Sequence, residues 1–273
     1  RDIKLLRQEL NTRKMTAKIV AKIESQPAID RIDEIVKEAD AVMVARGDLG
    51  VEVPFEQLAH WQRTIIDKCR LANKPVITAT QMLESMIQNP RPTRAEVTDV
   101  AHAVFDGTDA IMLSGESAGG KYPVKTVETM ARIAKWNESR HSVHKMVFVD
   151  QDPTSNIASA VVGIVNSVMK PEIDAVLVFT ETGYTARCLA KYRLTVPVIA
   201  ATDNQSTAES LTLSYGIHPV KIDMPAGPFS SAESIIKDLV KQDYLHHGQT
   251  IIVVHGYHWQ KPGNTNALAI VTV

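Results

Sequence analysis

Four short apolar segments in the first half of the chain each run directly into polar or acidic residues. They lie at 19–23, 41–44, 75–79 and 110–113. Short apolar runs of this kind are typical of strands buried on both faces, and apolar side chains recur at helical spacing in the segments between them. Parallel β/α barrels place their chemistry at the carboxyl ends of such strands. The pattern therefore predicts the α/β class, with part of a TIM (β/α)8 barrel and a functional site at one edge of its sheet.

Four strand–helix units fill residues 1–140, whereas a complete barrel needs roughly 250 residues. The sequence thus predicts half a barrel, with open strand edges at Ile19 and Ile111. Because the chain opens at Arg1 rather than at a methionine, we expect it to begin inside a larger protein. Helices are predicted at 3–10, 28–39, 54–71, 81–88 and 123–140, and Thr93 and Glu96 form the capping box of a further helix.

Residues 141–273 are predicted to form a second domain, which begins in a polar stretch without clear periodicity. Helical and strand-like segments alternate after it. The predicted strands lie at 174–179, 196–201, 217–222, 250–255 and 267–273, and the predicted helices lie at 154–169, 183–192, 206–215 and 231–246. This order favours a three-layer α/β domain with a mostly parallel sheet, in which one late strand is a candidate for antiparallel pairing.

The overall composition excludes several classes of protein. Basic residues total 30 and acidic residues 31 among 273, which gives a net charge of −1, so a nucleic acid or an acidic membrane surface is not an expected partner. No apolar run approaches the roughly 18 residues that span a membrane. Cys69 and Cys188 lie in unrelated predicted helices, where two reduced, buried thiols are expected. We therefore expect a cytoplasmic protein.

The candidate site begins at the first strand end. Lys22 and Glu24 are two residues apart, so on a strand they share a face. Asp48 follows the second strand, and two carboxylates with water and substrate oxygens are how Mg²⁺ is usually held. Thr80 offers a hydroxyl at the third strand end, and the backbone of 46–48 could bind an anion at a helix start. Plainer interpretations stay open: an ion pair at a strand end, a turn residue at Asp48 and an ordinary strand residue at Thr80.

Five motifs in this half resemble pyruvate kinase in content and order. They are Lys-Ile-Glu at 22–24, Ala-Arg-Gly-Asp-Leu-Gly at 45–50, Ala-Thr-Gln-Met-Leu-Glu-Ser-Met at 79–86, Arg-Pro-Thr-Arg-Ala-Glu at 91–96 and Met-Leu-Ser-Gly-Glu at 112–116. The second domain is similar to the carboxyl-terminal regulatory domain of that family. The resemblance implies an allosteric, homotetrameric enzyme of glycolysis that converts phosphoenolpyruvate and ADP to pyruvate and ATP.

The resemblance also assigns roles to individual residues. Lys22 would stabilise the transferring phosphoryl group, and Glu24 and Asp48 would bind Mg²⁺ or Mn²⁺. The backbone of Gly47 and Asp48 would meet the carboxylate of phosphoenolpyruvate, and Thr80 would help the enolate to acquire its proton. In the family, the K⁺ ligands, the arginines that contact phosphates and a lid domain come before the position of Arg1, so this chain alone is expected to be inactive.

A second candidate site joins a predicted strand to a helix in the second domain. Its residues are Thr180, Glu181, Thr182, Gly183, Tyr184 and Thr185. Hydroxyls and N–H groups at a helix start suit a phosphate, although an ordinary helix cap explains them too. The resemblance implies a sugar-phosphate or nucleotide effector here and a second effector loop at 256–263, whose departure from the best-known pattern leaves the effector unidentified.

Two other functions remain compatible with the residues. One is a Mg²⁺-dependent lyase or aldolase on a related pyruvate-enolate barrel, which also surrounds a metal with carboxylates. The other is a non-catalytic regulatory or assembly module. Motif 79–86 and motif 91–96 favour the kinase. The remaining candidates are given structural roles: His246 and His247 as surface residues, and Met82 and Met86 as core residues.

Overall fold

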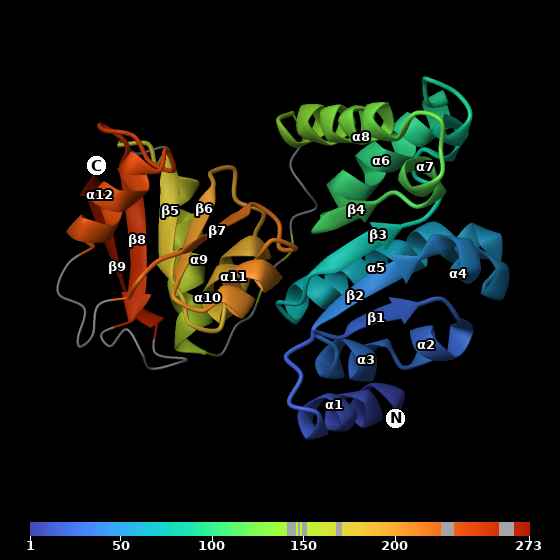
Figure 1. Ribbon diagram of the computed structural model, residues 1–273, viewed down its shortest axis with the longest axis horizontal. Helices are drawn as coiled ribbons and strands as arrows, with labels where there is room; N and C mark the ends of the chain where they lie inside the picture. Colours follow the sequence, from blue (N-terminus) through green and yellow to red (C-terminus); the bar gives the residue numbers. More distant parts are fainter. Residues whose placement is uncertain (141–145, 147, 149–151, 168–170, 225–231, 257–264) are drawn as a thin grey trace. The chain divides into compact units, whose positions relative to one another are not determined.

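The computed structural model describes residues 1–140, 146, 148, 152–167, 171–224, 232–256 and 265–273 (Figure 1). The chain forms two compact units, Arg1–Val147 and Phe148–Val273. The domain boundary predicted between residues 140 and 141 stays a prediction, because residues 141–145 lie outside the described residues.

The first unit is built on four parallel strands in the order β1-β2-β3-β4. They are β1 (Val20–Ile23), β2 (Ala41–Ala45), β3 (Val76–Ala79) and β4 (Ala110–Met112). The helices between and around them are α1 (Asp2–Thr12), α2 (Gln26–Asp30), α3 (Ile32–Glu38), α4 (Arg46–Glu52), α5 (Leu58–Leu71), α6 (Arg94–Asp106), α7 (Gly115–Ala118) and α8 (Pro123–Glu138), with 3-10 turns η1 (Phe55–Gln57) and η2 (Glu84–Ile87). The predicted partial barrel of parallel strands is confirmed.

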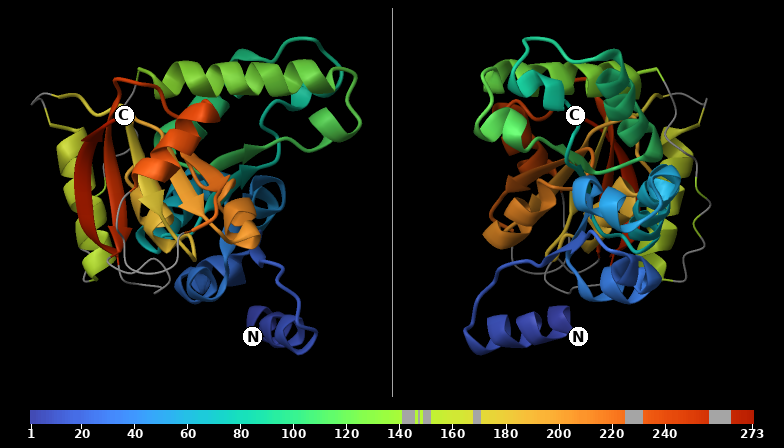
Figure 2. Two further views of the ribbon diagram at one scale, coloured as in Figure 1. Left: turned by 60° about the vertical axis from the view of Figure 1, so that its left-hand side comes forward. Right: turned by 90° about the vertical axis from the view of Figure 1, so that its right-hand side faces the viewer.

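The N-terminal helix α1 lies at the outside of this unit and buries none of its residues (Figure 2). Arg7 of α1 binds the end of α3 and a residue after it. Its Nη1 forms an ion pair with Asp40 Oδ2 at 2.7 Å, and its Nη2 donates to the carbonyl of Glu38 at 3.0 Å. The burial of the Asp40 carboxyl opposes ionisation, but the hydrogen bond from Arg7 and another from the Ile19 N–H hold its pKa below the ordinary value.

The predicted helix at 81–88 is wrong: only the short turn η2 forms there. Thr80 and Gln81 have φ angles of 71° and 54°, which a right-handed helix does not accommodate. Met82 and Met86 are fully buried, as predicted for core residues. The predicted helix at 28–39 is also divided, because the backbone at Arg31 (φ −118°, ψ 24°) interrupts it between α2 and α3. Asp48, for which a turn residue was one open interpretation, lies instead in the first turn of α4.

The predicted capping box of α6 is confirmed. Thr93 Oγ1 accepts the N–H of Glu96 at 3.2 Å, and Glu96 Oε2 accepts the N–H of Thr93 at 2.7 Å. The same carboxylate accepts the N–H and the hydroxyl of Ser85 at 2.7 and 2.6 Å. These bonds favour the ionised carboxylate and lower the pKa of Glu96 although its partial burial acts in the opposite direction. Glu96 therefore joins the η2 turn to the helix that follows it.

The second unit holds a five-stranded sheet in the order β7-β6-β5-β8-β9. Its strands are β5 (Ala175–Phe179), β6 (Val198–Thr202), β7 (Ile217–Lys221), β8 (Thr250–Gly256) and β9 (Thr265–Thr272). Only the β8–β9 pairing among the described strands is antiparallel, which confirms the prediction of one late antiparallel strand. The helices are α9 (Pro153–Val165), α10 (Tyr184–Ala190), α11 (Gln205–Leu211) and α12 (Glu233–Lys241).

Both faces of this sheet are covered, as a three-layer domain requires. Val176 and Val178 of β5 belong to one core cluster with residues of α9, α10 and α11. The alternate residue Leu177 belongs to a second cluster with residues of α12. Because successive side chains of a strand point to opposite faces, β5 contributes to both hydrophobic layers.

The predicted state of the cysteines is confirmed: Cys69 and Cys188 are free and buried, and burial raises the pKa of both thiols. Among the described helices, none combines the length and the apolar character that crossing a membrane requires.

Candidate functional site

The ends of β1 and β2 bring three predicted site residues together. Lys22 lies on β1, Glu24 follows that strand, and Asp48 lies in the first turn of α4, directly after β2. The Lys22 ammonium forms an ion pair with Glu24 Oε2 and lies 3.0 Å from Asp48 Oδ2. Parallel pairing of Ile23 with Val44 places both strand ends at one edge of the sheet, so Lys22 and Asp48 meet although they are 26 positions apart.

This cluster is charged and accessible to water. The side chains of Lys22, Glu24 and Asp48 are 50%, 42% and 63% exposed. Hydrogen bonds to Glu24 and then to Asp48 raise the pKa of Lys22. The hydrogen bond from Lys22 is the main cause that lowers the pKa of Asp48. The cluster therefore holds one ammonium and an ionised Asp48 at neutral pH.

The two carboxylates fit a divalent metal of a particular kind. Glu24 and Asp48 both reach the same cation, the Lys22 ammonium, so their oxygens can approach a shared point. Within the described ranges, no group of three or more His, Cys, Asp or Glu residues could hold a metal ion. The donor set therefore suits a hard cation such as Mg²⁺, which keeps several waters and uses one or two carboxylates, better than a metal in an all-protein cage.

Thr80 lies one residue beyond β3 and next to the start of α4. Its Oγ1 accepts the N–H of Gly47 at 2.8 Å and donates to the carbonyl of Ala79 at 2.6 Å. Its φ of 71° is an outlier for a β-branched residue and costs about 1–3 kcal/mol. The structure thus brings Thr80 and Gly47 together, and the Gly47 N–H that was expected to meet a substrate carboxylate already donates to the Thr80 hydroxyl.

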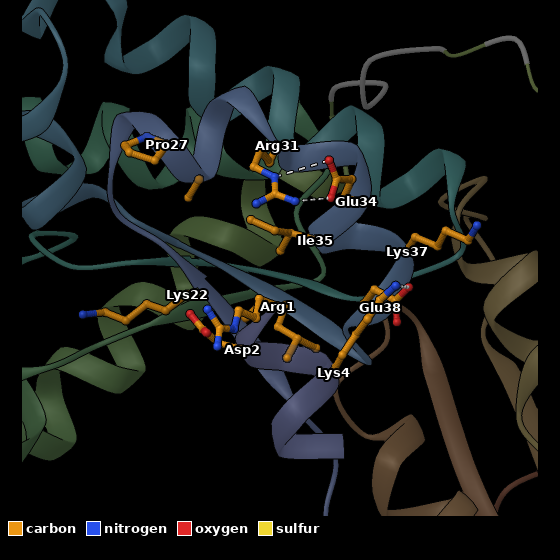
Figure 3. Close-up of a pocket in the computed structure, with 13 residues that line it drawn as sticks. Arg1, Asp2, Lys4, Lys22, Pro27, Arg31, Glu34, Ile35, Lys37 and Glu38 are labelled. Carbon is orange, nitrogen blue, oxygen red and sulfur yellow. Dashed lines mark hydrogen bonds and ion pairs between the residues drawn. The ribbon is translucent and has the colours of Figure 1, made fainter. Parts of the chain in front are cut away.

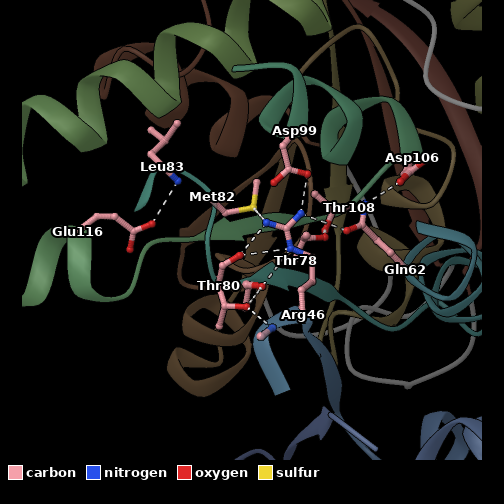
Figure 4. A network of polar contacts seen from close by, with 12 residues as sticks. Arg46, Gln62, Thr78, Thr80, Met82, Leu83, Asp99, Asp106, Thr108 and Glu116 are labelled. Atoms are coloured by element: carbon pink, nitrogen blue, oxygen red, sulfur yellow. Dashed lines mark hydrogen bonds and ion pairs between the residues drawn. The ribbon is translucent and has the colours of Figure 1, made fainter. Parts of the chain in front are cut away.

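Arg46 has a role that the sequence analysis missed. The motif suggested a backbone anion site there, but the Arg46 side chain is buried to 8% exposure and lies in a polar network between β2, β3 and α6 (Figure 4). It donates to the carbonyls of Ala79 and Thr80 and forms an ion pair with Asp99 at 2.6 Å. The sequence feature that could have predicted this role is an arginine directly after a strand buried on both faces. Such a side chain must find hydrogen-bond partners inside the protein.

Glu116, the acidic residue after β4, also has a structural role. Its carboxylate is 2% exposed and accepts the N–H groups of Leu83 at 3.2 Å and Ser114 at 2.7 Å. Figure 4 shows Glu116 reaching Leu83, apart from the bonds of Arg46. Glu116 therefore fixes the backbone after β3 and β4.

A pocket of about 490 Å³ lies between α1, β1 and the α2–α3 segment, with Lys22 among its lining residues (Figure 3). Figure 3 shows the Lys22 ammonium directed away from the Arg31–Glu34 pair. Lys4 is 3.3 Å from Glu38, and Arg31 is 2.6 Å from Glu34. The pocket includes neither Asp48 nor Thr80, so it borders the strand-end cluster only at Lys22.

The second candidate site surrounds the turn between β5 and α10. Thr180 Oγ1 accepts the N–H of Gly183 at 2.9 Å, and Thr182 Oγ1 accepts the N–H of Tyr184 at 3.4 Å. Gly183 has a φ of 78°, and a Cβ there would lie 2.8 Å from Arg187 Nη1. The turn therefore requires glycine, and two threonine hydroxyls bind the backbone N–H groups at the start of α10.

Some residues of this loop bond to other parts of the second unit, and others are exposed to water. Thr185 Oγ1 lies 2.8 Å from Thr265 Oγ1, and the carbonyl of Glu181 accepts the Thr207 hydroxyl at 2.8 Å. Thr182 and Tyr184 are exposed, and are the side chains that a ligand could reach. Residues 257–263 of the expected second effector loop lie outside the described residues. His246 and His247 are exposed.

Comparison with known families agrees with the order of the motifs. The family model for the pyruvate kinase barrel domain matches residues 1–127, and the model for the pyruvate kinase alpha/beta domain matches residues 155–271. This chain belongs to the pyruvate kinase family. The match covers both units and favours the kinase over a lyase or aldolase.

Curated relatives carry the same name. A pyruvate kinase of Clostridium acetobutylicum is 43% identical over 93% of this chain and 54% of that protein. A pyruvate kinase of Dictyostelium discoideum is 40% identical over 100% of this chain and 55% of that protein. The chain therefore spans about half the length of these relatives.

The ion pairs at the strand ends predict a specific titration. Replacing Lys22 by methionine should raise the pKa of Asp48 toward its ordinary 3.8, because the principal hydrogen bond to the carboxylate is lost. In the native protein, the stabilisation from Asp48 is present above its unfolded pKa and is lost as pH falls through the lowered folded pKa. The stabilisation from Lys22 is lost only as pH rises through its folded pKa, which is raised above the ordinary 10.5. Carbon-13 NMR of the Asp48 carboxyl measures the shift directly.

Arg31→Met is the matched control, since Arg31 pairs with Glu34 and not with the cluster. It should leave the Asp48 titration unchanged. An Asp48 pKa that is the same in Lys22→Met and in the unaltered protein would contradict the electrostatic coupling.

Proposed function

We propose that this chain forms part of a pyruvate kinase that transfers a phosphoryl group from phosphoenolpyruvate to ADP, giving pyruvate and ATP in glycolysis. The observation that carries the proposal is the meeting of Lys22, Glu24 and Asp48 at the carboxyl ends of β1 and β2, with Thr80 at the end of β3. Phosphoryl transfer depends on positioned charge, and these strand ends supply an ammonium beside two carboxylates of a kind that suits Mg²⁺.

Lys22 is the residue proposed to stabilise the transferring group. Its raised pKa keeps the ammonium charged at neutral pH, and its position between two carboxylates directs that charge toward any phosphate held there. Mg²⁺ or Mn²⁺ on Glu24 and Asp48 would supply further positive charge for the phosphate oxygens. Lys22 and these carboxylates then bind and orient the same group.

Thr80 is the proposed proton carrier. Its hydroxyl already takes part in two hydrogen bonds at the strand ends, one from Gly47 and one to Ala79. Turning the Oγ1 hydrogen away from the Ala79 carbonyl would free it for a bound enolate. The N–H groups of Gly47 and Asp48 would hold the substrate carboxylate once the Gly47 N–H leaves the Thr80 hydroxyl.

Further features come with this proposal. K⁺ is expected as a second ion, with ligands outside this chain, and a homotetramer is the expected assembly. A sugar-phosphate or nucleotide effector is proposed to meet the exposed side chains of Thr182 and Tyr184 in the loop at 180–185. A glycolytic role also implies a location in the cytoplasm.

The role of Lys22 predicts a kinetic signature in the full-length protein. Lys22→Met should lower kcat far more than it raises KM for phosphoenolpyruvate, because the ammonium acts on charge that is greatest in the transition state. Steady-state assays with Mg²⁺, K⁺ and ADP measure both constants. Lys37→Met removes an exposed lysine of α3 and should have no effect. Near-normal turnover in Lys22→Met would refute the role.

The metal proposal predicts altered Mg²⁺ activation. Glu24→Gln and Asp48→Asn should each raise the Mg²⁺ concentration needed for half-maximal activity, because each removes one charged oxygen ligand. Glu52→Gln, an exposed position on α4, serves as the control. Unchanged Mg²⁺ titrations in both variants would place the ligands elsewhere.

The effector proposal predicts a selective loss of activation. Thr182→Glu places a carboxylate at the exposed tip of the loop, where it should repel an effector phosphate and leave basal activity intact. Kinetics with and without fructose bisphosphate or another sugar phosphate test this, with Gln242→Glu at the exposed end of α12 as the control. If the unaltered protein is activated and Thr182→Glu keeps that activation, the loop is a helix cap only.

A further inference from the structure

Arg46 is a buried charge that the proposed chemistry does not use. Its guanidinium lies 2.6 Å from Asp99 Oδ1 on α6 and 3.4 Å from Gln62 Oε1 on α5. Gln62 is itself fixed, because its Nε2 donates to Asp106 Oδ2 at 2.9 Å. A buried guanidinium is tolerated only where its donors find partners, and these contacts hold one side of it rigidly against two helices.

The other side of the guanidinium binds the backbone where the chain leaves β3. Arg46 Nη2 donates to the Thr80 carbonyl at 2.7 Å, and Nε lies 3.3 Å from the carbonyls of both Ala79 and Thr80. Thr80 has a φ of 71°. A β-branched residue keeps such a conformation only where its surroundings impose it, and the Arg46 bonds act on the two carbonyls that flank this torsion.

The neighbour of Arg46 binds the side chain of the same threonine. The Gly47 N–H donates to Thr80 Oγ1 at 2.8 Å. Residues 46 and 47 therefore hold Thr80 twice, by its carbonyl and by its hydroxyl. Figure 4 shows Arg46 and Thr80 bonded to each other at the centre of the network.

We infer that Arg46 is a positioning residue for Thr80, a role that rests on the proposed function in which the Thr80 hydroxyl handles the proton of the reaction. The guanidinium fork fixes the left-handed backbone of Thr80, and this conformation places Oγ1 beside Gly47. Without the fork, Thr80 relaxes to a negative φ and its hydroxyl leaves that place.

The variant Arg46→Lys distinguishes the effect of the positive charge of Arg46 from the effect of its planar set of donors. The ammonium of Arg46→Lys keeps a positive charge for Asp99, but it lacks the planar set of donors that reaches an acid on one side and two carbonyls on the other. Asp99→Asn is the complementary variant: it removes the ion pair and leaves the bonds of Arg46 to Ala79 and Thr80 in place.

The experiment uses the full-length protein with phosphoenolpyruvate and ADP. Arg46→Lys should lower kcat on the order of 10²-fold, the size of effect that a misplacement of about 1 Å produces, with little change in KM. Asp99→Asn should lower Tm and leave kcat close to that of the unaltered enzyme. A crystal structure of Arg46→Lys should show Thr80 with a negative φ.

A double-mutant cycle with Thr80→Ala distinguishes positioning from a general structural role. If Arg46 acts through the Thr80 hydroxyl, adding Arg46→Lys to Thr80→Ala should cause no further loss of kcat. Independent structural damage would instead multiply the two losses.

Three results would overturn the inference: multiplied losses in the double variant, an unchanged kcat in Arg46→Lys, or an unchanged φ of Thr80 in its crystal structure. If Arg46→Lys does not fold, Asp99→Asn decides, since a loss of kcat there ties activity to the ion pair, and an intact kcat with a lowered Tm supports the inference. Absence of kinase activity in the unaltered full-length protein would refute the proposed function alone, and the Thr80 φ in Arg46→Lys would still test the positioning role.

Discussion

Parallel pairing of β1, β2 and β3 is the constraint on which the candidate site depends. The register aligns Ile23 with Val44 and Ala45 with Ala79, so three strands end at one edge of the sheet. The residues of the proposed site lie at or directly after these strand ends. A shift of one residue in this register would turn the side chains to the opposite face, and the buried apolar residues of all three strands oppose such a shift.

Charges at this edge fall into two groups with different physical roles. Lys22, Glu24 and Asp48 are about half exposed, so their ion pairs contribute little to stability and can exchange partners with a bound ion or phosphate. Arg46 and Glu116 are buried, and each binds backbone groups that follow a strand. The buried charges fix the loops, and the exposed charges remain available for ligands.

The β5–α10 turn of the second unit is held by a different kind of contact. Its hydroxyls, Thr180 Oγ1 and Thr182 Oγ1, accept the N–H groups of Gly183 and Tyr184 at the start of the helix, and Arg187 of the same helix donates to the Thr182 carbonyl at 2.9 Å. Local caps of this kind depend on residues two or three positions apart. The hydroxyl bonds at the start of α10 are thus local, whereas the turn after β3 is held by residues 11 or more positions away, in α4 and α6.

The sequence by itself determined the parallel order of strands, the antiparallel last strand, the capping box of Thr93 and the approach of Lys22, Glu24 and Asp48. These follow from apolar patterning and from spacing along the chain, which are local properties. The tertiary structure alone decided the positive φ of Thr80, the loss of the helix predicted at 81–88 and the buried position of Arg46. Each of these depends on contacts between residues more than 30 positions apart, such as Arg46 with Thr80, and such contacts override local helical preference without leaving a periodic signal in the sequence.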